Sequence, residues 1–85
     1  MPEISRFRGV IVYMYHDDHA PPHFHVTYQG FEAAIDIKTR GVVAGRIPPK
    51  VHAYVVQWAG YYEDELLENW IRCQNGHKPQ KIRPL

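Results

Sequence analysis

Hydrophobic and polar residues follow two different periods along this chain of 85 residues. Up to about residue 47, apolar and polar residues alternate in short runs that Gly and Pro interrupt, which predicts β-strands. From residue 48 onward, apolar residues recur every three or four positions, which predicts helix. We therefore expect one α+β domain over residues 1–85. A small antiparallel sheet of three to five strands would carry a long C-terminal helix or helix pair on one face.

The sheet region is expected over residues 1–47. Residues 10–15 are mostly β-branched or aromatic and predict a strand. Residues 4–8 are compatible with the beginning of that same strand, with Gly9 as a bulge or bend. A turn near Gly41 leads to a short strand over residues 42–47.

Residues 23–37 predict a hairpin with a two-residue loop, Gln29-Gly30. Counting outward from this loop pairs Phe24 with Ile35 on the apolar face of the sheet. The same count pairs His23 with Asp36 on the other face. This register gathers the large apolar residues on one face, as a half-buried hairpin requires.

The helical region is expected over residues 48–75, and Asn75-Gly76 is typical of a helix C-terminus. One apolar stripe runs through it at helical spacing: Val51, Val55, Trp58, Tyr62, Leu66, Trp70 and Cys73. A break at Gly60 and the acidic residues 63–65 would divide it into two helices. The basic tail, residues 76–85, is compatible with a solvated end, with contact to nucleic acid, or with a short edge strand around Ile82.

The composition is that of a folded protein, with 45% hydrophobic and 13% aromatic residues. A formal net charge of +1 argues against a polycation that coats nucleic acid. Cys73 is the single cysteine, so neither an intramolecular disulfide nor a cysteine-based zinc knuckle is expected. The first residues do not look like a signal peptide, and no apolar run approaches a membrane span. We expect a reduced, cytoplasmic protein with no membrane partner.

Four of the six histidines lie between residues 16 and 25. His23 and His25 share the strand face that points away from the expected core, so we expect them to serve activity rather than packing. With His19 from the preceding loop they form a candidate ligand set for a divalent metal such as zinc. In that arrangement Asp36 would hold His23 from the second coordination shell.

The same histidines are compatible with acid–base chemistry that needs no metal. His23 and His25 would divide the roles of base and acid in phosphodiester cleavage, with Asp36 orienting His23 and His19 nearby. An RNA substrate would then need cationic contacts to its phosphates, for which the candidates are Arg6, Arg8, Lys38 and Arg40. A third interpretation is an ordinary solvated sheet surface. The sequence leaves these three open.

Several segments resemble a small bacterial family, domain of unknown function 4160. The most specific is the run from Asp17 to Val26, which contains His19, Pro21-Pro22, His23 and His25. The opening residues 1–4, the tyrosine-rich first strand and residues 65–70 are also similar, so the likeness covers nearly the whole chain. Members of this family often accompany another small family, domain of unknown function 2442, in an arrangement that resembles a toxin–antitoxin pair.

The resemblance thus implies a ribonuclease-like toxin with a small antitoxin-like partner protein, by analogy only. The alternative is a protein without catalytic activity that binds a metal or a partner. Whether the protein is an enzyme stays open at this point. The enzyme hypothesis places the function on the histidine-bearing face of the sheet, whereas a partner protein would dock through the sheet edge or the tail.

Overall fold

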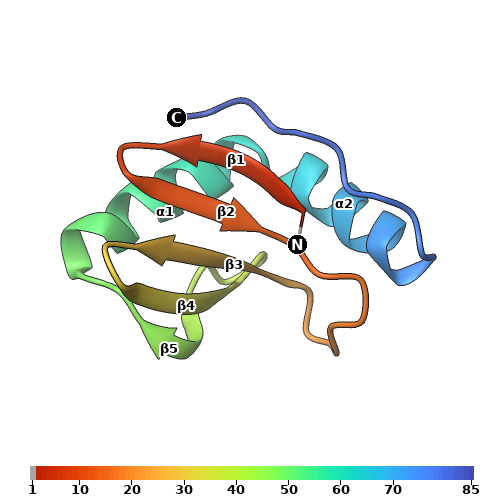
Figure 1. Ribbon diagram of the computed structural model, residues 1–85, viewed down its shortest axis with the longest axis horizontal. Helices are drawn as coiled ribbons and strands as arrows, with labels where there is room; N and C mark the ends of the chain where they lie inside the picture. Colours follow the sequence, from red (N-terminus) through yellow and green to blue (C-terminus); the bar gives the residue numbers. More distant parts are fainter. Residues whose placement is uncertain (1) are drawn as a thin grey trace.

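The computed structural model describes residues 2–85. Its five strands are β1 (Glu3–Phe7), β2 (Val10–Tyr13), β3 (His23–Tyr28), β4 (Phe31–Asp36) and β5 (Val42–Arg46). They form one antiparallel sheet in the order β1-β2-β3-β4-β5. Two helices follow, α1 (Pro49–Tyr61) and α2 (Glu63–Gln74) (Figure 1). The α+β fold expected from the sequence is confirmed.

The β3–β4 hairpin has the predicted register. His23 pairs with Asp36 and Phe24 with Ile35, and the two-residue loop is Gln29-Gly30. Both loop residues have positive φ, 44° and 85°, which is the pattern of the type I′ turn that suits a twisted hairpin. Strand alternation and a single glycine were therefore sufficient to fix this part of the sheet.

The N-terminal strand prediction was wrong in one respect. Residues 4–8 do not begin the same strand as residues 10–15, because the chain reverses at Arg8-Gly9 and Phe7 pairs with Val10. Arg8 and Gly9 have φ values of 48° and 80°, the same turn geometry as at Gln29-Gly30. A register irregularity between Glu3 and Ser5 interrupts the alternation along β1, and this concealed the hairpin.

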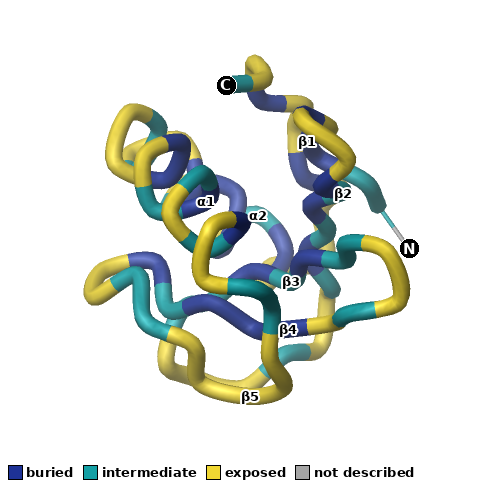
Figure 2. The backbone as a smooth tube through the Cα atoms, turned by 90° about the vertical axis from the view of Figure 1, so that its left-hand side faces the viewer, coloured by how far each residue is buried: buried dark blue, intermediate teal, exposed yellow. Residues whose placement is uncertain are grey.

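The helical segment is a helix pair. The chain leaves helical geometry at Tyr62, and α2 begins with Glu63, Asp64 and Glu65 in its first turn. Acidic side chains are favourable there because they face the positive end of the helix dipole. The apolar stripe is buried against the sheet except at Tyr62, which is half-buried. Figure 2 shows the sheet curling around the helices, with buried segments facing inward.

The tail packs against the domain and is not an edge strand. A single ladder-like bond joins it to β1, from the Ile82 amide to the Ile4 carbonyl oxygen at 2.7 Å. The Asn69 side chain exchanges two bonds with the Gln80 backbone, and the Trp58 indole donates to the Arg83 carbonyl. The tail therefore lies along β1, and β5 forms the exposed edge at the other side of the sheet.

Within residues 2–85, neither helix combines the length and the apolar character that crossing a membrane requires.

Candidate metal centre

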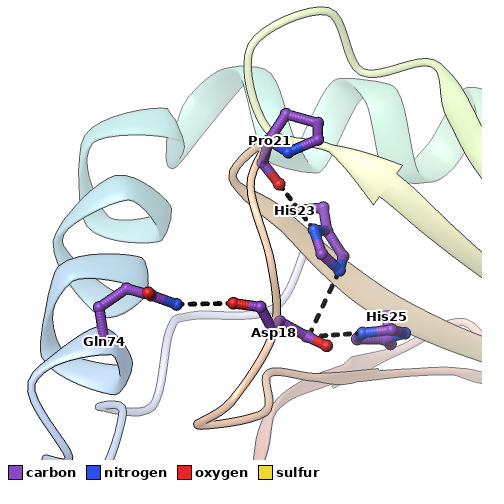
Figure 3. A network of polar contacts seen from close by, with 5 residues as sticks. All are labelled: Asp18, Pro21, His23, His25 and Gln74. Carbon is purple, nitrogen blue, oxygen red and sulfur yellow. Dashed lines mark hydrogen bonds and ion pairs between the residues drawn. The ribbon is translucent and has the colours of Figure 1, made fainter.

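The loop that joins β2 to β3 folds back over the beginning of β3 and brings Asp18 to the two strand histidines (Figure 3). Two contacts hold this loop in place. The Gln74 side chain, at the end of α2, donates to the Asp18 backbone carbonyl at 3.0 Å. The Ile37 amide donates to the Pro22 carbonyl oxygen at 3.0 Å. Helix α2 and the end of β4 thus position the loop from both sides.

One carboxylate oxygen of Asp18 faces both imidazoles. Asp18 Oδ2 lies 2.8 Å from His25 Nε2 and 3.3 Å from His23 Nε2. The three candidate ligand atoms lie within 4.8 Å of one another, and all three residues are half-buried. Among residues 2–85 this is the one group of three or more such side chains that converges in this way. We call it the Asp18–His23–His25 cluster.

A hydrogen bond sets the orientation of the His23 ring. Its Nδ1 lies 2.7 Å from the Pro21 carbonyl oxygen, and a carbonyl can only accept, so Nδ1 carries a proton. In the neutral ring the Nε2 lone pair then points at the Asp18 carboxylate. Two acceptors facing each other need either a proton or a cation between them. Metal-binding histidines in proteins show this same bond from the other ring nitrogen to a backbone carbonyl.

Two separations within the cluster can be compared with those of a tetrahedral zinc site. Zinc bonds of about 2.0–2.1 Å to nitrogen or oxygen place neighbouring ligand atoms about 3.3 Å apart. The Asp18–His23 separation of 3.3 Å already has this value, and the Asp18–His25 separation of 2.8 Å is the length of the present hydrogen bond. Small side-chain rotations that widen this second separation would admit an ion.

Asp18 completes the cluster in the structure, whereas the sequence pattern suggested His19. His19 is exposed and lies outside the cluster. Nothing in the alternation of residues along a strand indicates which loop residue folds back. The adjacent acids Asp17 and Asp18 are the one available signal in the sequence.

Asp36 lies opposite His23 in the register, but its carboxylate is engaged elsewhere. Its Oδ1 accepts bonds from the backbone amides of Lys38 and Thr39, both at 2.8 Å, and so closes the turn after β4. The expected role in orienting His23 is filled instead by the Pro21 carbonyl and by Asp18. Asp36 is thus placed as a turn-forming residue.

His23 also packs, which differs from the expectation that it serves activity alone. Its side chain is 12% exposed, and its ring centroid lies 5.3 Å from that of Trp70 on α2. Trp70 of α2 therefore packs against this ring. His25 is more open, with 26% of its side chain exposed and the Tyr15 ring against its edge at 4.4 Å.

The four predicted phosphate contacts are dispersed. Arg6 forms an ion pair with Glu3, Arg40 forms one with Glu63, and Arg8 lies over the Tyr54 ring. The Arg6 guanidinium lowers the pKa of Glu3 through their hydrogen bond. Lys38 lies in the turn after β4. None of the four lines the two clefts that border the cluster.

Two open clefts border the cluster. The larger, which we call the Asp18 cleft, has a volume of about 1100 Å³ and is lined by Asp18 and by tail residues. The smaller, on the face of β3, β4 and β5, has a volume of about 350 Å³ and is lined by His25. Tyr15 lines both, and burial together with the Glu32 and Asp18 carboxylates raises the pKa of its hydroxyl. Tyr15 is therefore a protonated donor between the clefts at neutral pH.

Comparison with known proteins gives one match. The family model described as "Domain of unknown function (DUF4160)" matches residues 9–71, which include the whole cluster and most of both helices. Neither the comparison with curated proteins nor that with solved structures found a match. Because the family model covers well over half of the sequence, the chain belongs to the DUF4160 family.

Proposed function

We propose that this protein binds a divalent transition-metal ion at the Asp18–His23–His25 cluster. The observation that carries the proposal is the His23 ring, whose Nδ1–H is committed to the Pro21 carbonyl while Nε2 points at the Asp18 carboxylate. A cation between His23 Nε2 and the Asp18 carboxylate would satisfy both acceptors. His25 Nε2 lies 2.8 Å from the same carboxylate oxygen. Two imidazoles and one carboxylate suit zinc and its neighbours in the first transition series.

The contacts of His23 favour this proposal over metal-free acid–base catalysis. A general base needs a ring nitrogen that faces the substrate. Both nitrogens of His23 face protein oxygens, those of Pro21 and Asp18. If a metal ion is bound, the bond to the Pro21 carbonyl orients the His23 ring from the second coordination shell. The other ring nitrogen, which faces Asp18, is then the ligand atom.

Three protein ligands leave at least one coordination position for water or a substrate, which is the pattern of catalytic rather than structural zinc sites. A metal ion bound there would polarise a phosphoryl or carbonyl oxygen and lower the pKa of a bound water. Hydrolysis of RNA, a small partner protein and a cytoplasmic location stay predictions. The geometry of the cluster supports metal binding itself.

Titration with Co²⁺ tests the proposal, using protein without a histidine tag. We expect one ion per chain, with visible absorption bands typical of low-coordinate Co²⁺. Asp18→Asn should weaken binding by about 100-fold or more, because loss of a direct ligand costs at least as much as loss of a second-shell contact. Asp17→Asn is the matched control, since Asp17 is the adjacent loop carboxylate and lies outside the cluster.

Equal affinity of the Asp18→Asn and Asp17→Asn variants would exclude the cluster as the site. So would a wild-type protein that binds no Co²⁺. His19→Gln serves as a second control, because His19 is the ligand that the sequence pattern suggested. We expect its affinity to match that of the wild type, since His19 lies outside the cluster.

A further inference from the structure

The Asp18 cleft carries two lysines that the proposed metal site does not use. Lys78 and Lys81 line it from the tail, opposite the loop residues Tyr15, His16 and Asp17. In the part of the chain that the structure describes, neither ammonium group forms a hydrogen bond or a close ion pair. The cleft thus presents two cationic groups on the side facing the loop that supplies Asp18.

The backbone that carries these lysines is anchored. The Arg72 side chain donates to the Lys78 carbonyl at 3.0 Å, and the Gln80 backbone is bound in both directions by Asn69. Asn69 is buried. In the tail, Pro79 and Ile82 are buried as well, and Gln80 and Lys81 lie between them. The lysines therefore extend from a fixed edge of the cleft, and binding an anion there requires ordering only their side chains.

A metal ion bound to Asp18 would change the sign of the formal charge of the cleft lining. Its lining holds three carboxylates, Glu3, Asp17 and Asp18, against the two lysines, which gives a formal charge of −1. A divalent ion on Asp18 changes this to +1. The ion would be the largest local charge, and it would convert a cleft that repels anions into one that attracts them.

We propose that the Asp18 cleft binds a phosphate ester, with one phosphoryl oxygen on the open coordination position of the metal and the others within reach of Lys78 and Lys81. The inference rests on the proposed metal site and names its substrate class. Phosphate fits because it presents several charged oxygens to separate cations at once, whereas a carboxylate presents two on one side. Ammonium groups and a metal ion are the usual partners of such oxygens.

The test is ³¹P NMR with protein in excess over Co²⁺, so that no free ion remains. The signal of a phosphorus atom two bonds from the paramagnetic ion, through the coordinating oxygen, is strongly broadened. The probes are inorganic phosphate, a nucleoside 5′-monophosphate and a dinucleoside monophosphate. We expect the ³¹P signal of at least one ester to broaden with Co²⁺-loaded protein and to stay sharp with metal-free protein. The two esters then show whether the site takes monoesters, diesters or both.

Lys78→Gln with Lys81→Gln should raise the dissociation constant of the bound ester about tenfold, since each tenfold step corresponds to about 1.4 kcal/mol and two charge contacts are lost. Arg46→Gln with Lys50→Gln is the matched control. It removes the same charge from two exposed cationic residues that do not line the cleft. We expect its dissociation constant to stay within about twofold, as for a screened distant charge.

Each outcome decides between the two proposals. If the wild type binds Co²⁺ but broadens no ester signal, the phosphate site is wrong and the metal site stands. If the wild type binds no Co²⁺, both are wrong. Equal weakening by the two double variants would refute the cleft as the binding place, and broadening of inorganic phosphate alone would refute the assignment to an ester.

Discussion

Asp18 is the residue on which the candidate site depends. Its side chain faces two histidines, while its backbone carbonyl is held by Gln74 from the end of α2. The carboxylate is therefore fixed by a contact 56 residues away in the sequence. Its neighbour Asp17 is exposed and lies outside the cluster. Two adjacent, chemically identical residues thus have different roles because of tertiary contacts alone.

Gly45 has a structural role that is equally specific. It lies in β5 with φ of 70°, opposite Ala33, where a side chain would collide with the Glu32 carbonyl oxygen. Gly45→Ala should therefore cost about 2–4 kcal/mol of unfolding free energy, from backbone strain and the clash together. Urea denaturation measures this cost.

Gly30→Ala provides the control for Gly45→Ala. Gly30 also has positive φ, 85°, but nothing lies within 4 Å of the position its Cβ would take. Only the strain remains, about 1 kcal/mol. If the two variants lose the same stability, the close approach of Gly45 to β4 is not a constraint on the fold.

At the scale of elements, α1 is held to the sheet and to the tail by Trp58. The indole is fully buried, its ring lies 5.2 Å from Phe7 and 5.7 Å from Phe24, and its Nε1 donates to the Arg83 carbonyl. Trp58→Ala should cost about 3–5 kcal/mol, as truncation of a buried aromatic typically does. That is much of the stability of so small a domain.

Tyr61→Ala is the matched truncation on the same helix. Tyr61 is 67% exposed, and we expect a change within about 0.5 kcal/mol, the usual range for surface positions. The difference between the midpoints of urea unfolding for the two variants measures the contribution of the packed face. Similar midpoints would mean that α1 does not pack on the sheet through its predicted stripe.

At the scale of the whole molecule, the sequence predicts the features that follow from a hydrophobic periodicity. The strand alternation around Phe24 and Val26 fixed the β3–β4 register, and the helical stripe fixed which face of α1 and α2 is buried. Period alone did not reveal the turn at Arg8-Gly9, because the irregularity between Glu3 and Ser5 interrupts the alternation along β1.

The candidate site was predicted in part for the same reason. His23 and His25 follow from strand geometry, since they are two residues apart on one face. Asp18 could not be predicted, because the loop that carries it has no period and is placed by α2 and β4. The contact of His23 with Trp70 was missed likewise, since it depends on how α2 packs against the sheet.

Anomalous scattering from a crystal grown with zinc tests the central claim most directly. The account predicts one zinc ion within about 2.0–2.2 Å of Asp18 Oδ2, His23 Nε2 and His25 Nε2. The Pro21 carbonyl should remain bonded to His23 Nδ1. A zinc ion bound instead by the exposed His16 or His19, or a cluster with no anomalous peak at saturating zinc, would contradict the account.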